Sequence, residues 1–370
     1  MKRVLVHGLK DPCGGVEHVA MSYVRQIICA HKDIQFDFLI FGNSFSLERQ
    51  CTNWGGQVIY CPPRREDYKA YQKKMSDIFS EIQYDVVWCN VSGLTNLDVL
   101  VQAKKHHVPM RIVHSHVTQL SWGNPLMHVL VPVLHYWNKT RVQQYANAFW
   151  ACSPEAGAFM FPKSVASKIA VIKNAIDVNV FCTAEHSREA TRRELGCDGM
   201  VVCHVARMCR EKNQLFLLDV MKKIVEREST AKLLFVGDGE MRDAVEAKII
   251  ELSLEKNVIL TGYQTEIAKY LRSSNVLLLP SLSEGLGLSV IEAQASGVPC
   301  VVSDTLPREV DISGAVTFMP LSKTAAQWAD AVIAASKQQI LDPSSCVRNA
   351  GYDIEVASLK VYAMMVGNDQ

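Results

Sequence analysis

The stretch Pro280–Asp304, PSLSEGLGLSVIEAQASGVPCVVSD, contains the pattern that decides the fold. It predicts the end of a buried strand, a glycine turn at 285–287, a helix over 288–296 and a second buried strand. A helix that begins directly after a strand and a glycine turn leaves several backbone N–H groups without an intrahelical partner. Because these groups lie at the positive end of the helix dipole, the turn favours binding of an anion such as phosphate.

Two glutamates flank this turn, with seven residues between them. Glu284 immediately precedes the turn, and Glu292 lies inside the predicted helix. A nucleotide sugar needs both features, because its diphosphate accepts hydrogen bonds while its ribose and sugar hydroxyls donate them. The alternative is an ordinary strand–helix–strand unit whose glutamates are only solvated, and two glutamates without the glycine turn would favour it. The glycine turn between the two glutamates favours an anion-binding site instead.

Strand-like and helix-like segments alternate along the whole chain. The first half begins with the apolar run KRVLVHG at 2–8, a glycine-bearing loop and the helix-like run VEHVAMSYVRQII at 16–28. A second series begins with the predicted strand KIAVIKN at 168–174. This alternation predicts an α/β protein with parallel sheets covered by helices on both faces. With 370 residues and 48% hydrophobic content, the chain suits two doubly wound, Rossmann-like domains.

Composition and charge exclude several classes of protein. Lys and Arg total 39 and Asp and Glu total 38, so the net charge is +1 and nothing indicates a nucleic-acid partner. The 12 cysteines are scattered without a Cys-x-x-Cys pair, which is typical of reduced thiols in a cytoplasmic protein. We expect neither a signal peptide nor a membrane span. The first loop, from Gly8 to Gly15, lacks the G-x-G-x-x-G pattern of a dehydrogenase.

The letters SEGLGLSVIEAQASGVPCVVSD, with Glu284 and Glu292 at their spacing, resemble glycosyltransferase family 4, the retaining GT-B enzymes. The resemblance extends over nearly the whole chain. It implies two Rossmann-like domains facing each other across a cleft, with an N-terminal acceptor domain over 1–168 and a C-terminal nucleotide-sugar donor domain over 169–351. The C-terminal helix, over 352–370, is expected to cross back to the first domain.

The resemblance also implies roles for residues of the donor domain. Arg207 and Lys212 match the pair that grips the donor diphosphate, and two fixed cations can neutralise the charge that develops on it as it departs. Glu292 is expected to bind the ribose, and Glu284 to lie near the transferred sugar. Further donor contacts are expected from Gly15, Tyr263, Gly285, Leu286, Gly287 and Leu288. An exposed loop tyrosine and an ordinary glycine turn remain alternatives for Tyr263 and Gly15.

Two histidines alternate on the predicted strand MRIVHSH, so the side chains of His114 and His116 point to the same face. A metal pair is one interpretation, but no third ligand is apparent. The resemblance implies that His116 contacts the sugar near the reaction centre and that His114 has a structural role. The catalytic set that it implies is His116, Glu284, Arg207 and Lys212.

No Asp-x-Asp pair, the usual metal holder of nucleotide-sugar transferases, occurs in the chain. The nearest imitation is Asp238-Gly239-Glu240. Arg207, Lys212 and the helix that begins after Gly287 already supply positive potential for a diphosphate. We therefore expect no metal and no other cofactor.

The apolar stretch PLMHVLVPVLHYW, over 125–137, precedes Lys139 and Arg141. A buried helix kinked near Pro132 is the favoured interpretation. The alternative is a segment that dips into a membrane interface, which would make the protein peripheral at the inner face of the plasma membrane. The basic run over 62–74 could meet anionic lipid or a pyrophosphate acceptor, although a solvated face is the simpler interpretation.

Taken together, the resemblance implies retaining transfer of a hexose from a UDP-linked donor to an acceptor hydroxyl. The letters RIVHSH at 111–116 and VVSDTLPREVDI at 301–312 are similar to bacterial capsule and exopolysaccharide glycosyltransferases, so a glycan or lipid-linked oligosaccharide is the expected acceptor. Two alternatives stay open, namely a GT-B nucleotide-sugar epimerase and a non-catalytic nucleotide-sugar-binding partner of a polysaccharide assembly.

Overall fold

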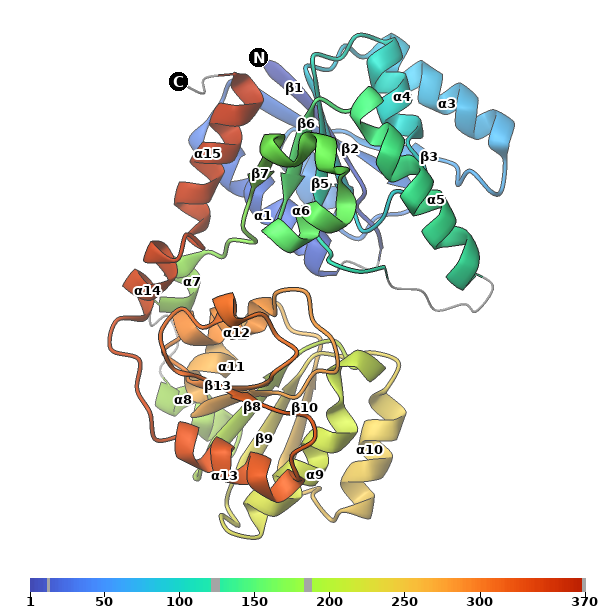
Figure 1. The fold of residues 1–370 in the computed structure, drawn as a ribbon. Helices are drawn as coiled ribbons and strands as arrows, with labels where there is room; N and C mark the ends of the chain where they lie inside the picture. The colour runs from blue at the N-terminus through green and yellow to red at the C-terminus, as the bar shows by residue number, and fades with distance from the viewer. Residues whose placement is uncertain (12–13, 121–126, 183–187, 368–370) are drawn as a thin grey trace. The chain divides into compact units, whose positions relative to one another are not determined.

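The chain divides into two units, shown as a ribbon in Figure 1. The computed structural model describes residues 1–11, 14–120, 127–182 and 188–367. The first unit comprises Met1–Ile176 and the C-terminal segment from Ile354, and the second comprises Asp177–Asp353. Each unit contains one parallel sheet with helices around it, so the predicted pair of Rossmann-like α/β domains is confirmed.

The sheet of the first unit has seven parallel strands in the order β3-β2-β1-β4-β5-β6-β7. Its strands are β1 (Lys2–His7), β2 (Ile34–Phe41), β3 (Val58–Cys61), β4 (Val86–Val91), β5 (Met110–Ser115), β6 (Ala148–Ala151) and β7 (Ile169–Val171). Its helices are α1 (Gly15–Ala30), α2 (Glu48–Asn53), α3 (Tyr68–Glu81), α4 (Asp98–Lys105), α5 (Met127–Arg141), η1 (Val142–Gln144), α6 (Pro154–Met160), η2 (Lys163–Lys168) and α15 (Ile354–Val366). Central strands are apolar on both faces because helices cover both, as the fully buried Val4, Leu5 and Val6 of β1 illustrate.

The sheet of the second unit has six parallel strands in the order β10-β9-β8-β11-β12-β13. Its strands are β8 (Val201–Val205), β9 (Lys232–Val236), β10 (Val258–Gly262), β11 (Val276–Leu279), β12 (Cys300–Ser303) and β13 (Val316–Met319). Its helices are α7 (Val178–Cys182), α8 (Arg188–Glu194), η3 (Arg210–Lys212), α9 (Gln214–Val225), α10 (Arg242–Glu251), α11 (Ile267–Ser273), α12 (Leu288–Ala295), η4 (Arg308–Val310), α13 (Ala325–Ala335) and α14 (Pro343–Asn349). A core around Leu217, Leu233 and Trp328 joins α9 and α13 to the sheet.

The boundary between the units falls between Ile176 and Asp177, later than the predicted boundary at 168/169. The strand at 168–174 was expected to open the second sheet. Instead, β7 pairs in parallel with β6, with Ile169 opposite Phe149, and completes the first sheet. An apolar strand can join either of two neighbouring sheets, and its sequence does not say which, because both would bury the same side chains.

The C-terminal helix α15 belongs to the first unit, where it packs against α1 (Figure 1). The Tyr362 hydroxyl donates to Asp33 Oδ2 at 2.6 Å, and its ring stacks on His31 with 3.5 Å between the ring centroids. Val361 and Met365 are buried on the same helix. The return of the chain to the first unit thus rests on both apolar and polar contacts.

The interpretation of 125–137 as a buried helix is wrong for the part that the structure describes. Helix α5 forms, and Pro132 lies inside it, but Leu130, Val133, Tyr136 and Trp137 are exposed. Residues 125–126 lie outside the described residues. Among the side chains of α5 that the structure describes, from residue 130 onward, the fully buried ones are polar, namely His135 and Asn138.

Among the helices of the described residues, none combines the length and the apolar character that crossing a membrane requires.

Candidate active site

The candidate site lies at the carboxyl edge of the second sheet, where the strand order reverses. From β8 the chain proceeds to β9 and β10 on one side, and it returns to β11, β12 and β13 on the other. The loops that follow β8 and β11 are therefore neighbours. Ligands of open α/β sheets bind at such a point, beyond the carboxyl ends of the strands. Arg207 and Lys212 follow β8, and Glu284 follows β11, so the topology brings these predicted residues to one edge.

Lys212 and Glu284 form an ion pair between Nζ and Oε1. Their side chains are 22% and 8% exposed, so the pair is largely shielded from water. Glu284 Oε1 also accepts a hydrogen bond from Ser281 Oγ at 2.9 Å. The two loops are joined as well by the Leu282 N–H, which donates to the Glu211 carbonyl at 2.7 Å. The sequence predicted both residues of the pair, but only the fold shows that they bind each other.

Arg207 lies in a more open position. Its side chain is 70% exposed, and its Nη2 donates to Glu240 Oε2 at 2.8 Å. Gly239 allows this arrangement, because a Cβ there would lie 2.3 Å from the Met208 carbonyl oxygen. The glycine lets the loop after β9 approach the loop after β8 closely, and the Met208 N–H donates to the Asp238 carbonyl at 2.9 Å. Arg207 can therefore exchange a solvated carboxylate partner for a phosphate.

The helix α12 begins beside this pair without a side-chain cap. Its N-cap, Gly287, has φ +78°, a conformation that favours glycine, and a Cβ there would lie 2.9 Å from Leu306 Cδ2, so the leucine side chain would have to shift. Within the part of the chain that the structure describes, the backbone N–H groups of Gly285, Leu286, Gly287, Leu288 and Ser289 donate to no other group. A helix N-terminus with free N–H groups and a nearby cation is suited to phosphate.

Glu292 lies on α12 and is 6% exposed. No residue that the structure describes donates a hydrogen bond to its carboxyl group. Burial therefore raises the pKa of Glu292 from 4.5 to about 7. A buried carboxyl group without a partner is costly unless a ligand supplies one, which makes Glu292 a candidate binding residue for hydroxyl groups.

Tyr263 is 75% exposed and follows β10, the edge strand of this sheet. Strand β9 separates β10 from β8, so the fold does not bring Tyr263 directly to the Lys212–Glu284 pair. A donor contact by Tyr263 therefore stays a prediction, with an exposed loop tyrosine as its alternative.

The turn that most resembles a metal motif is occupied by ion pairs. Asp238 Oδ2 accepts from Arg242 Nη1 at 3.0 Å, while Glu240 binds Arg207. No group of three or more His, Cys, Asp or Glu side chains suited to a metal ion gathers among the described residues.

In the first unit, the strand order reverses between β1 and β4, and the predicted loop after β1 lies at this point. Gly14 is the N-cap of α1, and its N–H donates to Glu17 Oε2 at 2.9 Å. Glu17 Oε1 accepts from the Lys10 N–H at 3.0 Å, so this buried carboxylate holds the described ends of the loop. Nothing lies within 4 Å of a Cβ placed on Gly15. Sequence reasoning missed Glu17, since an acidic residue in a first turn is common and gives no specific signal.

His116 follows β5, and its Nε2 is 2.9 Å from Asn90 Oδ1 at the end of β4. Asn90 Nδ2 donates to the His7 carbonyl at 3.4 Å, which turns the amide oxygen toward His116. This orientation of Asn90 favours a proton on His116 Nε2, while the buried Nδ1 makes no hydrogen bond of normal length among the described residues and the Asn174 side chain interacts with the ring. Burial lowers the pKa of His116 to about 4, so the ring is neutral at pH 7.

His114 lies behind His116, with 4.1 Å between the ring centroids. It is fully buried, and its Nδ1 accepts from Trp88 Nε1 at 3.3 Å. Sequence reasoning missed Asn90, although a polar residue at the end of the apolar run YDVVWCN was a usable signal.

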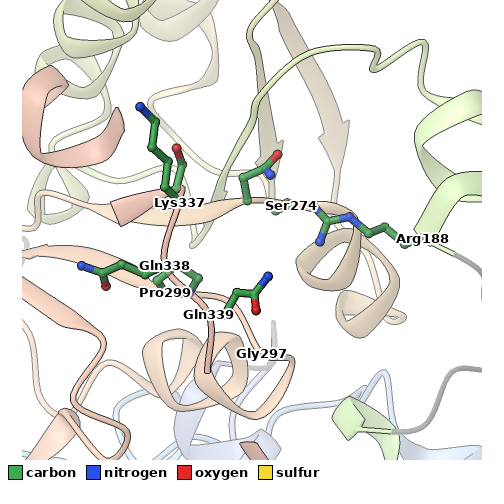
Figure 2. A pocket seen from close by; sticks show the side chains of 9 residues that line it. Arg188, Ser274, Gly297, Pro299, Lys337, Gln338 and Gln339 are labelled. Carbon is green, nitrogen blue, oxygen red and sulfur yellow. The ribbon is translucent and has the colours of Figure 1, made fainter. Parts of the chain in front are cut away.

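A separate pocket in the second unit is not part of this site. Figure 2 shows it lined by Arg188, Ser274, Gly297, Pro299, Lys337, Gln338 and Gln339, among others. Ser274 precedes β11, and Gly297 and Pro299 precede β12. The pocket therefore lies at the amino edge of the sheet, opposite the edge that carries Lys212 and Glu284.

Comparisons of sequence and of fold with known proteins find relatives of the same kind. Residues 199–338 match the family described as Glycosyl transferases group 1. The putative glycosyltransferase EpsF of Bacillus subtilis is 27% identical over 96% of this chain and 95% of its own. The UDP-Gal:alpha-D-GlcNAc-diphosphoundecaprenol alpha-1,3-galactosyltransferase of Escherichia coli is 34% identical over 37% of each chain. The crystal structure of Anabaena HepE in complex with UDP and glucose is similar in fold, with a TM-score of 0.78, 16% identity and coverage of 99% and 100%.

Proposed function

Because the chain belongs to the GT-B glycosyltransferases of the family 4 type, we propose that it transfers a hexose from a UDP-linked donor to an acceptor hydroxyl, with retention of configuration. The proposed acceptor is a glycan or a lipid-linked oligosaccharide of a polysaccharide pathway. The observation that carries the proposal is the meeting of the Lys212–Glu284 pair with the uncapped N-terminus of α12 at the reversal point of the second sheet.

The relatives support the choice of donor and acceptor. The Escherichia coli relative is named for UDP-galactose as donor and a diphosphoundecaprenol-linked sugar as acceptor. The Anabaena structure holds UDP and glucose. EpsF, which matches over almost the whole chain, is named as a putative glycosyltransferase. A uridine diphosphate sugar is therefore the donor to test first.

The donor diphosphate is proposed to bind the free N–H groups of Gly285 to Ser289, with Lys212 and Arg207 as cations. In the reaction, the bond between the anomeric carbon and the β-phosphate oxygen breaks, and negative charge develops on that phosphate. Fixed cations and helix N–H groups stabilise developing charge most effectively, because they need no reorganisation. Glu284 holds Lys212 in place, so the ammonium group does not have to be ordered when the donor binds.

Retention is proposed to occur on one face of the sugar. The acceptor oxygen bonds to the anomeric carbon on the side from which the phosphate departs, and the leaving phosphate oxygen takes the proton of the acceptor hydroxyl. Glu292 is proposed to accept hydrogen bonds from the ribose. The neutral His116 is proposed to accept one from a substrate hydroxyl at Nδ1, which makes no hydrogen bond of normal length among the described residues.

The decisive experiment is a screen of donor hydrolysis and transfer over UDP-linked hexoses. We expect slow release of UDP from one donor without acceptor, and faster release when a glycan or lipid-linked acceptor is added. Binding of UDP without any turnover would instead favour the non-catalytic alternative. Conversion of the donor to another nucleotide sugar without acceptor would favour the epimerase.

A further inference from the structure

The pocket at the amino edge of the second sheet is lined by charge of one sign. It has a volume of about 240 Å³ and lies opposite the edge that carries the candidate active site. Arg188 and Lys337 line it, and none of the described residues around it is acidic. The other lining residues are serines, amides, a glycine and a proline. We call it the amino-edge pocket. A hollow that holds cations without a carboxylate favours an anion.

The Arg188 guanidinium is the central cation of this pocket. Arg188 is the first residue of α8, and Figure 2 shows its guanidinium directed toward Ser274. Its Nη1 donates to the Arg272 carbonyl at 3.2 Å, and within the described part of the chain it forms no ion pair and no other hydrogen bond. Since a guanidinium carries several N–H donors, most of them stay available to a ligand.

Further positive charge lies around Arg188. Burial and the nearby charge of Arg192 lower the pKa of Arg188, while the adjacent Glu189 raises it. Among the residues that the structure describes, Arg192 donates to uncharged groups alone, namely two carbonyls and the Asn275 amide oxygen. Arg272, on α11, buries Nε and Nη1 without a described hydrogen-bond partner. An anion in the pocket would relieve the repulsion between these cations.

Asn275 adds a hydrogen-bond donor whose direction is fixed. Its Oδ1 accepts from the Val201 N–H at 2.9 Å and from Arg192 Nη1 at 3.1 Å. Both of these partners can only donate, so the amide oxygen faces them and Nδ2 points away from them. No residue in the described ranges accepts a hydrogen bond from Nδ2. The pocket therefore combines a fixed neutral donor with a cation, which suits an anion and not a cation.

Stabilisation of a helix end explains only part of this arrangement. Arg188 and Arg192 donate to the last two carbonyls of α11, where the helix dipole is negative. That role uses neither the Nδ2 group of Asn275 nor the remaining N–H groups of Arg188. It also gives no reason for Lys337 to line the same pocket. These unused donors are what indicate a ligand.

We propose that the amino-edge pocket binds a small molecule that carries a phosphate group. Arg188, Asn275 and Lys337 come from three different elements and can donate to different oxygens of one phosphate, whereas a carboxylate offers two oxygens. The volume of about 240 Å³ is below the roughly 300–1,000 Å³ of pockets for drug-sized ligands, which favours a small metabolite over a peptide. The proposal goes beyond glycosyl transfer, because such a ligand would not compete with a donor at the opposite edge.

The test is a phosphorus NMR titration of the whole protein with inorganic phosphate and with glycerol phosphate. UDP is present in excess, so that the cations of the donor edge are occupied. We expect the probe signals to broaden on binding, and excess acetate to displace the probes poorly. Asn275→Asp keeps an oxygen for Val201 and Arg192 but replaces the free donor by a negative oxygen. It should bind the probes at least about tenfold more weakly, and Arg188→Ala should act in the same direction.

The matched control is Arg193→Ala, since Arg193 is exposed on the same helix but does not line the pocket. It removes the same charge as Arg188→Ala and should bind the probes as the unaltered protein does. A cooperative thermal unfolding transition shows that each variant is folded. No binding by the unaltered protein, equal binding by Asn275→Asp, or equally strong binding of acetate overturns the proposal. Failure of UDP to bind would count against the proposed function alone, because the effect of Asn275→Asp still assigns the probe to the pocket.

Discussion

Glu292 is a buried residue whose protonation a bound ligand should change. Burial raises its pKa from 4.5 to about 7, so near neutral pH a large fraction of the protein carries this group protonated. Hydroxyl groups that donate to the carboxylate favour its charged form and lower its pKa. A ribose bound at Glu292 must therefore displace a proton.

We predict that UDP binding at pH 7 releases protons and that UDP affinity increases as the pH rises toward 7. Calorimetry in two buffers of different ionisation enthalpy measures the released protons directly. Glu292→Gln, which keeps the shape of the side chain but cannot titrate, should abolish the release and weaken binding by roughly 1.5–3 kcal/mol. Proton-neutral binding by the unaltered protein would remove Glu292 from the ribose site.

Lys212 and Arg207 differ in burial, and this difference predicts unequal effects. We predict that Lys212→Ala lowers kcat by roughly 100-fold to 1000-fold, because the charge on the leaving phosphate loses a shielded partner. Arg207→Ala should lower kcat less, since its side chain is 70% exposed and water can replace part of its effect. Steady-state kinetics on the active donor measure both, and Arg242→Ala serves as control because Arg242 pairs with Asp238 and Glu246 on the surface. An unchanged kcat in Lys212→Ala would refute the diphosphate role.

Asn90 positions His116, and its replacement by a carboxylate should change the titration of the ring. We predict that Asn90→Asp raises the pKa of His116 above its present value of about 4, because a negative charge next to Nε2 favours the imidazolium. NMR titration of the histidine ring protons follows this change, and the acidic limb of the activity profile should move in the same direction. A pKa of His116 that does not change would show that Asn90 does not hold the ring in solution.

At the scale of elements, α12 and the turn before it combine two functions in few residues. The turn ends the strand β11 and starts the helix, and it leaves five N–H groups without acceptors in the described part of the chain. Gly287 and Gly285 differ in whether the structure could accommodate a side chain in their place. A Cβ on Gly287 meets Leu306 at positive φ, whereas a Cβ on Gly285 meets nothing within 4 Å.

We predict that Gly287→Ala destabilises the protein by about 1 kcal/mol or more, because alanine is strained at positive φ. Gly285→Ala should leave the unfolding temperature nearly unchanged. Thermal unfolding of the two variants, each with and without UDP, separates the effect on folding from the effect on binding. Equal stability of both variants would contradict the conformation of the turn at Gly287.

At the scale of the whole molecule, each unit has its own sheet and its own buried core, and the carboxyl edge of the second sheet carries the cations that a diphosphate needs. We predict that transfer continues in excess EDTA, because Lys212, Arg207 and the start of α12 provide the positive potential that a divalent ion would otherwise supply. The measurement is transfer rate before and after chelation. Activity that is lost in EDTA, restored by Mg²⁺ or Mn²⁺ and absent in Asp238→Asn would reassign the turn at Asp238 to metal binding.

Much of this protein follows from local patterns in its sequence. Alternating apolar strands and amphipathic helices determine a parallel α/β fold, because only helices on both faces cover such strands. The glycine turn with Glu284 and Glu292 predicts its own strand, turn and helix, since the positive φ at Gly287 favours glycine there. These features depend on neighbours within a few residues, which a sequence shows directly.

Only the tertiary structure decides features that depend on partners distant in the chain. The Lys212–Glu284 pair and the Asn90–His116 hydrogen bond join side chains at the ends of neighbouring strands. No single segment of the sequence shows which strands are neighbours in the sheet. The membership of β7 in the first sheet is decided by pairing with β6. The orientation of α5 depends on polar contacts of His135 and Asn138 with Leu94, a residue more than 40 positions earlier in the chain, because breaking these hydrogen bonds would leave buried polar groups without partners.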